Sequence, residues 1–289
     1  MALFGVSTHL FVGTRLDRAH LVDIAGHGFG AVEVFAVRDH FDYRDHRAIT
    51  ALSEWLDDTR LRFHYMHAPI AGRYVNGTWQ GGLSIAASDD AARRAAVDEA
   101  SAALAVAESL PYGVLVLHCG VPVPHAKPGD NHRGALVRSL EELSPLAHRH
   151  GVRLAIEVIP NELSTAGALV DLLESDMDVD NVGICLDVSH ARLMGDVVDA
   201  IETCSGHVIS THLHDNRGRT DDHLVPGKGV VDWDAALLAF QKVGYEGIWM
   251  FEPGVSAEGT RVLEQLARAR ERFESLLSLG DEMMGMDEV

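Results

Sequence analysis

The sequence predicts a single (β/α)₈ (TIM) barrel, and three observations lead to that fold class. Short apolar runs alternate with amphipathic segments, which is the pattern of repeated β-α units around a parallel sheet. The chain has 289 residues, close to the roughly 250 residues of a typical barrel of this kind. Polar residues recur where the apolar runs end, and barrel enzymes carry their active sites at the carboxyl ends of the strands. The fold therefore also predicts where a site would lie.

Eight segments have the short, apolar and β-branched character of strands, as in the AVEVFA run at 31–36 and the VRLAI run at 152–156. Alternation along a strand lets Glu157 share the inward face with Ala155, and Asp187 the inward face with Cys185. By the same parity, His67, His118, His212 and Glu252 can point inward, together with Glu33 lower in its strand. The predicted strands are 3–8, 31–36, 62–66, 112–117, 152–156, 181–186, 208–211 and 247–251.

The segments between these strands show helical spacing of apolar residues, for example Ile49, Leu52 and Leu56 on one face. A long connection with several glycines and Trp79 precedes 88–110, and loops of this length are often functional, for example as a lid. We expect one barrel over 1–280 without a break, and a flexible acidic tail or an oligomer contact at 281–289. The predicted helices are 17–27, 45–59, 88–110, 133–150, 165–174, 197–204, 234–243 and 261–279.

The composition limits the partners that the protein can have. A net charge of −19 opposes binding to nucleic acid or to an anionic membrane surface, so a small solute is the expected partner. The three cysteines form no C-x-x-C pair, and neither a leader nor a membrane-spanning run is recognisable. We expect a soluble cytoplasmic protein that could form homo-oligomers.

The predicted strand ends supply a metal site. Glu157, Asp187, His212 and Glu252 end four successive strands, and three carboxylates with one imidazole suit a divalent ion such as Mn²⁺, Mg²⁺, Co²⁺ or Zn²⁺. A metal-bound carbonyl acidifies the neighbouring C–H, and two flanking carboxylates can then remove and return a proton. Glu157 and Glu252 are the candidates for this acid and base chemistry.

The stretch 207–229 adds further polar groups beside His212. It contains the pair Asp221 and His223 in a D-x-H pattern, followed by the PGKG turn with Lys228. A glycine turn lets the backbone approach a ligand, although one short turn is weak evidence for a phosphate site. His214, two residues after His212, is expected beside the ligands or at the surface.

Five motifs resemble the xylose isomerase-like barrels, which include sugar phosphate isomerases, ketose 3-epimerases, inosose dehydratases and apurinic endonucleases. They are EVIPN from Glu157, LDVSH at 186–190, HLHD at 212–215, DDHLVPGKG at 221–229 and YEGIWMFE ending at Glu252. The resemblance implies that Glu157, Asp187, His212 and Glu252 hold the catalytic metal, with Glu157 and Glu252 transferring protons. It also implies that His190, Asp221 and His223 line the substrate pocket. Arg217 resembles the arginine that follows the metal histidine in the epimerases, although there it lies one residue further along.

The sequence leaves more than one function open. A sugar isomerase or epimerase and an inosose-type dehydratase both begin by removing a proton from the carbon next to a carbonyl group. A barrel that only binds sugar acids would catalyse no reaction. In apurinic endonucleases the residues that match His67, His118, His190, Asp221 and His223 bind two additional zinc ions, which implies a multi-zinc phosphodiester hydrolase as the alternative. The charge of −19 disfavours that alternative because DNA enzymes neutralise phosphates with Lys and Arg. The prediction is a metal-dependent isomerase or epimerase of a small sugar or keto-polyol.

Overall fold

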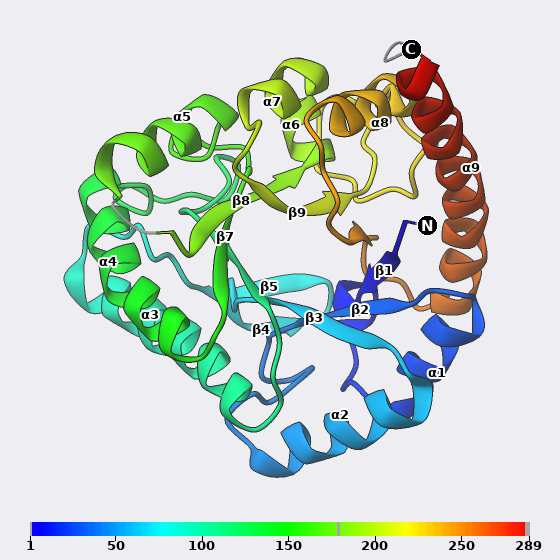
Figure 1. Ribbon diagram of the computed structural model, residues 1–289. Coiled ribbons are helices and arrows are strands. Elements are labelled where there is room, and N and C mark those ends of the chain that lie inside the picture. Colours follow the sequence, from blue (N-terminus) through cyan, green and yellow to red (C-terminus); the bar gives the residue numbers. More distant parts are fainter. Residues whose placement is uncertain (1, 178–179, 287–289) are drawn as a thin grey trace.

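Eight parallel strands close into a barrel in the computed structural model, which describes residues 2–177 and 180–286 (Figure 1). Around the barrel the strands follow the order β1-β10-β9-β8-β7-β6-β3-β2, and every adjacent pair is parallel. The predicted (β/α)₈ fold is confirmed. The barrel strands are β1 (Phe4–Ser7), β2 (Ala31–Phe35), β3 (Arg62–His67), β6 (Val114–His118), β7 (Arg153–Glu157), β8 (Val182–Asp187), β9 (Val208–Leu213) and β10 (Trp249–Phe251).

The helices form an outer ring around these strands (Figure 1). The segment expected to be helical over 165–174 divides into α5 and a π-helical turn, η3. The helix α6 was not predicted, because its seven residues are too few to show apolar periodicity. The helices are α1 (Arg18–Gly26), α2 (His46–Thr59), α3 (Asp90–Ala105), α4 (Arg133–Arg149), α5 (Ala166–Asp171), α6 (Val188–Met194), α7 (Val197–Thr203), α8 (Trp233–Lys242) and α9 (Gly259–Met286), with short turns η1 (Thr8–Phe11), η2 (Val106–Glu108) and η3 (Leu172–Asp176).

The last helix, α9, continues beyond its predicted end at 279 and reaches Met286. Part of the segment predicted as a tail is therefore helical backbone, and residues 287–289 lie outside the described part of the chain. The division into a barrel over 1–280 and a tail stays a prediction.

Aspartate residues start most of the outer helices. An aspartate carboxylate at the N-cap accepts hydrogen bonds from the free N–H groups of the first turn, which stabilises the helix start by about 1 kcal/mol. Part of the acidic excess of the chain thus has a structural role. The capping residues are Asp17, Asp45, Asp89, Asp187, Asp196 and Asp232.

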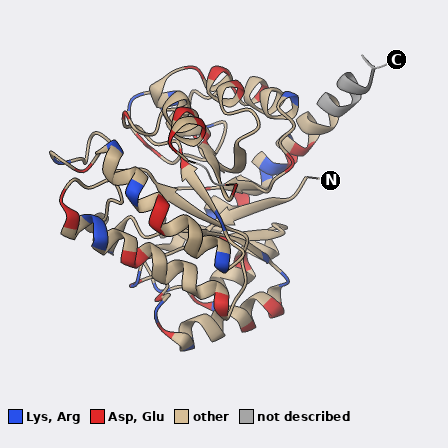
Figure 2. Ribbon diagram, turned by 60° about the vertical axis from the view of Figure 1, so that its left-hand side comes forward, with Lys and Arg blue, Asp and Glu red and all other residues tan. Residues whose placement is uncertain are grey.

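Two apolar cores support the barrel. The larger core fills the space between the strands and the outer helices, and a smaller cluster fills the barrel interior beneath the strand ends. Ala155 and Cys185 belong to the interior cluster, as the alternation along their strands predicted. Acidic and basic positions are interspersed along the outer helices in the view of Figure 2. Among the helices that the structure describes, none combines the length and the apolar character needed to cross a membrane.

The long connection after β3 folds into an antiparallel hairpin, β4 (Ala71–Val75) and β5 (Thr78–Gly82). Its two-residue turn holds Asn76 and Gly77 at φ 50° and 79°. Positive φ at both central residues defines the type I′ turn, for which Asn-Gly is the favoured sequence. The hairpin had been expected only as a loop, although the Asn-Gly pair between alternating residues is a hairpin signal.

Candidate active site

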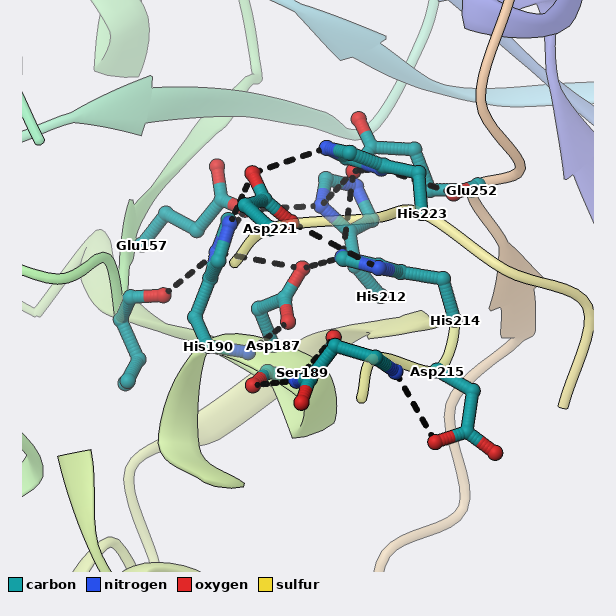
Figure 3. A network of polar contacts seen from close by, with 12 residues as sticks. Glu157, Asp187, Ser189, His190, His212, His214, Asp215, Asp221, His223 and Glu252 are labelled. Atoms are coloured by element: carbon teal, nitrogen blue, oxygen red, sulfur yellow. Dashed lines mark hydrogen bonds and ion pairs between the residues drawn. The ribbon is translucent and has the colours of Figure 1, made fainter. Parts of the chain in front are cut away.

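Four polar side chains meet at the carboxyl ends of the adjacent strands β7 to β10 (Figure 3). Glu157 ends β7, Asp187 ends β8, and His212 lies on β9 opposite Asp187. Glu252 directly follows β10. One ligand atom from each of the four residues lies within 4.8 Å of the others. The structure therefore brings all four predicted metal ligands into one group.

This group, named the central cluster from here on, is almost completely buried. Glu157, Asp187 and His212 are 0% exposed, and Glu252 is 3% exposed. The Nδ1 atom of His212 lies 3.0 Å from Oε1 of Glu157 and 3.6 Å from Oε2 of Glu252. Buried carboxylates are costly without positive charge, and in the described part of the chain these three carboxylates form ion pairs only with histidines.

Two more histidines face the other oxygen of Glu157. The Nε2 atoms of His67 and His118 lie 3.2 and 3.1 Å from Oε2 of Glu157. His67 is oriented by a 2.8 Å hydrogen bond from Nδ1 to the carbonyl oxygen of Ala68. Glu157 thus stands between His212 on one side and the His67 and His118 pair on the other, which is the geometry of a bridging carboxylate.

A third set of side chains surrounds Asp221. The Nε2 atoms of His190 and His223 lie 3.0 and 3.1 Å from Oδ2 of Asp221. Their Nδ1 atoms face backbone carbonyl oxygens, that of Val158 for His190 and that of Glu252 for His223. A histidine that donates one N–H to a carbonyl has a fixed ring orientation and tautomer. Both Nε2 atoms are therefore directed at Asp221.

His214 belongs to the same set and was not predicted as a site residue. It is fully buried, its ring stacks on that of His223 with centroids 3.9 Å apart, and its Nε2 lies 2.8 Å from Oδ2 of Asp187. Together with His190, Asp221 and His223 it forms a second group of ligand atoms within 4.8 Å. The sequence signal was the alternation along the strand, because β9 extends through Leu213 and His214 follows His212 on the same face.

The local charges shift the pKa values of these groups in opposite directions. Burial disfavours the cation of His190, but the carboxylates of Asp187 and Asp221 raise its pKa to about 10. Burial also disfavours the cation of His223, but the carboxylate of Asp221 raises the pKa of His223 to about 9. Burial raises the pKa of Glu252 to about 7.

Glu157 behaves differently from Glu252. Burial also disfavours its anion, yet the positive charges of His212 and His118 outweigh that effect and hold the pKa of Glu157 well below its ordinary value. The two candidate proton-transfer carboxylates thus have different affinities for a proton. Such a difference is typical of pairs that act as base and acid.

Asp215 organises the loop that carries Asp221 and His223. Its buried carboxylate accepts hydrogen bonds from four backbone N–H groups and one indole. Gly229 packs directly against it, since a Cβ there would lie 2.3 Å from Oδ1 of Asp215. The PGKG turn therefore wraps around a carboxylate. The donors are the backbone N–H groups of Asn216, Gly227, Gly229 and Val231 and Nε1 of Trp233.

The two predicted cationic substrate contacts lie at the surface. The side chain of Arg217 is 68% exposed and pairs with Asp222 at 3.2 Å. Lys228 is exposed at the tip of the PGKG turn. In this structure neither residue is part of the buried clusters.

Three aromatic rings form a wall beside the histidines, and of these sequence reasoning singled out only Trp79. His9, just after β1, donates a hydrogen bond from Nδ1 to the carbonyl oxygen of Pro253 at 3.0 Å. Its ring lies 4.9 Å from that of His223 and stacks with Trp79 of β5 at 6.1 Å. Trp79 also contacts Phe35, whose ring stacks on His67 at 4.3 Å. The hairpin is thereby packed against the strand ends that carry the site.

The central cluster fits a divalent metal ion. The cluster consists of three carboxylates and one imidazole that are buried together. Among the described residues, the three carboxylates form ion pairs only with histidines. Such a donor set suits a hard or borderline divalent cation. The fold and this site define the class: a (β/α)₈ barrel with a carboxylate and histidine cluster suited to a metal at its carboxyl end.

The chain belongs to the xylose isomerase-like TIM barrel family, whose family model matches residues 21–277. The resemblance that the motifs indicated is therefore confirmed.

Similarity to individual proteins is moderate. An uncharacterized protein of Methanocaldococcus jannaschii, MJ1311, is 27% identical over 86% of this chain and 83% of its own length. Inosose isomerase of Bacillus subtilis is 29% identical over 38% of this chain and 42% of its own. D-psicose 3-epimerase of Agrobacterium fabrum is 31% identical over 50% of each chain. The chain thus matches half or less of the length of these two named enzymes.

A solved structure described as a D-tagatose 3-epimerase-like protein superposes over 98% of this chain and 99% of its own, with a TM-score of 0.80. Its sequence identity is 23%, so this similarity concerns the fold.

Proposed function

We propose that the protein is a divalent-metal-dependent isomerase or epimerase of a small sugar or keto-polyol. The observation that carries the proposal is the central cluster, in which Glu157 and Glu252 flank His212 in a buried group of metal-ligand type. The names of the relatives, inosose isomerase and D-psicose 3-epimerase, point to the same reaction class.

The two carboxylates would divide the proton transfer between them. A bound divalent ion would supply Lewis acidity to a carbonyl and a neighbouring hydroxyl oxygen of the substrate. Glu157, with a pKa well below its ordinary value, is ionised and accepts the proton from carbon. Glu252, which faces Nδ1 of His212 at 3.6 Å, would return a proton from the other side.

The Asp221 set would bind the hydroxyl groups of the substrate. Asp221 and His223 are the more exposed members of that set, with side chains 35% and 19% exposed, and His118 is 15% exposed on the opposite side of Glu157. Substrate would therefore enter between these residues. The aromatic ring of Trp79 would cover one face of the pocket, which limits the substrate to a small molecule.

Conversion of a panel of ketoses and inososes, followed by NMR, tests the activity after metal analysis of the purified protein. About one metal ion per chain and interconversion of two stereoisomers or of an aldose and ketose are expected. Loss of water from an inosose would identify the dehydratase instead. A protein that binds no divalent metal and converts no member of the panel would exclude the proposal.

The roles of the carboxylates are tested with Glu157→Gln and Glu252→Gln. Each variant should lower solvent deuterium exchange at the substrate carbon by at least about 100-fold, the usual contribution of a general acid or base. Glu162→Gln is the matched control, because Glu162 lies in the loop after β7 but is exposed. Exchange at the wild-type rate in both active-site variants would remove them as acid and base.

A multi-metal phosphodiester hydrolase is the second candidate, and the two additional ligand groups favour it. His67 and His118 beside Glu157, and the Asp221 set, could hold two further ions. About three zinc ions per chain and cleavage of abasic-site DNA would support the hydrolase. The charge of −19 and the interspersed acidic positions on the outer helices disfavour nucleic acid as a partner (Figure 2).

A further inference from the structure

Glu33 is a buried carboxylate that the proposed reaction does not use. It lies on β2 at 0% exposure, three strands away from β9, which precedes the loop that carries Asp221. Its Oε2 atom is 3.0 Å from Nε2 of His212, and Ser7 lies beside it in the register of the paired strand β1. A barrel interior is normally filled with apolar or small side chains, so a fully buried carboxylate there needs a specific partner.

The partner is the imidazole of His212, which Glu33 and the central cluster hold from opposite sides. Nε2 faces Glu33, while Nδ1 faces Glu157 at 3.0 Å and Glu252 at 3.6 Å. An ionised carboxylate only accepts hydrogen bonds, so the contact with Glu33 requires a proton on Nε2. A neutral His212 with its proton on Nε2 has its lone pair on Nδ1, the atom that points into the central cluster.

We propose that Glu33 is a positioning residue that fixes the ring orientation and the tautomer of His212, so that Nδ1 is the metal-binding nitrogen. Carboxylate partners of this kind orient metal-binding histidines and raise their basicity, and their loss typically weakens metal affinity 10–100-fold. The inference rests on the proposed function, because it presupposes that the central cluster binds a divalent metal.

A purely structural role would give a different result. If Glu33 only filled the barrel interior, its replacement would lower stability and leave the metal affinity of the folded protein unchanged. Glu33→Gln separates the two roles, because glutamine has nearly the same shape but carries no charge, and its amide can present an N–H to His212.

The experiment measures Mn²⁺ and Co²⁺ affinity by competition with a chelator for the wild type, Glu33→Gln and Glu33→Asp, together with thermal unfolding of the metal-free proteins. We expect Glu33→Gln to bind both ions about 10–100-fold more weakly. Glu33→Asp, which keeps the charge, should recover part of the affinity. The control is Tyr65→Phe, which removes another buried polar group of the barrel interior, a hydroxyl that hydrogen-bonds to backbone atoms of Ile209 and Ile248.

Tyr65→Phe should lower the melting temperature and keep the wild-type metal affinity. In Glu33→Gln, ¹⁵N spectra of labelled histidines should show a smaller share of the Nε2-protonated form of His212, because the amide can also donate to that atom. Wild-type affinity in folded Glu33→Gln would overturn the inference but leave the proposed function standing. A wild-type protein that binds neither ion would instead contradict the proposed function itself.

Discussion

Glu157 is the residue at which the parts of the site converge. Its Oε1 atom faces His212, and its Oε2 atom faces His67 and His118. The central cluster alone supplies the four ligands that a single-metal isomerase needs. Because Glu157 also faces His67 and His118, further metal-binding groups lie directly beside that cluster. A bridging carboxylate keeps a second ion within reach of the first, so the number of bound metals distinguishes the two candidate functions.

Asp215 shows how a single residue sets the shape of a functional loop. Its carboxylate is the shared acceptor for five donors distributed over 216–233, so the positions of Asp221 and His223 depend on it. Asp215 therefore has a structural role, because the groups that donate to its carboxylate belong to the loop and to Trp233.

We therefore expect Asp215→Asn to reduce the free energy of unfolding by about 2–4 kcal/mol, since each hydrogen bond to a buried charged group contributes about 1.5–3 kcal/mol. Urea unfolding measures the loss, and hydrogen exchange at the amides of Gly227, Gly229 and Val231 locates it. Asp222→Asn changes the same charge in the same loop, where the carboxylate pairs with exposed Arg217. Among the described residues this carboxylate accepts hydrogen bonds from only two further groups, the backbone N–H of Arg217 and the hydroxyl of Thr220. The variant should cost less than Asp215→Asn, about 1–2 kcal/mol. Equal losses in both variants would show that Asp215 does not organise the loop.

At the scale of elements, the β4–β5 hairpin is the part of the fold that depends most on local turn chemistry. It pairs only with itself and contacts the site through Trp79, which packs against His9 and Phe35. Isolated hairpins are marginally stable, so its position depends on the Asn76-Gly77 turn and on this aromatic contact.

We predict that Gly77→Ala, which places a side chain at φ 79°, will loosen the hairpin, whereas Gly82→Ala will not. A Cβ at either position meets no atom within 4 Å, so the two variants differ mainly in the backbone conformation required. The expected result for Gly77→Ala is faster hydrogen exchange in β4 and β5 and an increased KM, with little change of global stability. If both variants exchange alike, the turn does not control the hairpin.

Long periodic elements could be predicted from the sequence, whereas the exact ends of the strands could not. The eight strands and the outer helices follow from periodicity over many residues, and the parity of each strand placed Glu157, Asp187, His212 and Glu252 at one end of the barrel. His9 was missed because the chain enters the turn η1 directly after β1, where strand parity no longer applies. His214 was undervalued because its role depends on β9 extending past His212, and strand ends are not fixed by composition.

At the scale of the whole molecule, the acidic composition and the histidine content serve different parts of the structure. Many aspartates cap outer helices, whereas buried Glu33, Glu157 and Glu252 pair with histidines at one end of the barrel, and Asp187 does both. A count of charges from the sequence cannot separate these two populations, because the separation is produced by burial. The net charge therefore excludes some partners but does not describe the site.

The buried ion pairs make the stability of the metal-free protein depend on pH. Folding raises the pKa of His190 to about 10 and that of His223 to about 9. A raised histidine pKa contributes stability that is fully present below the unfolded value of about 6.5 and is lost as the pH rises through about 9 to 10. Asp221 has the opposite sign: burial opposes its ionisation, but His223 and His190 lower its pKa, so its contribution is present above pH 3.8 and is lost as the pH falls below that value.

We expect the free energy of unfolding, measured with urea in the presence of a chelator, to fall between pH 6.5 and 10 by up to about 1.4 kcal/mol per pH unit for each histidine that loses its proton. Asp221→Asn removes the main charge that raises the pKa of His223 and one of the charges that raise the pKa of His190, so its stability should decline less over this range. Asp222→Asn, which leaves the histidines paired, should keep the wild-type slope. An unchanged slope in Asp221→Asn would mean that other groups produce the pH dependence, and that the Asp221 set does not hold its histidines protonated before a ligand binds.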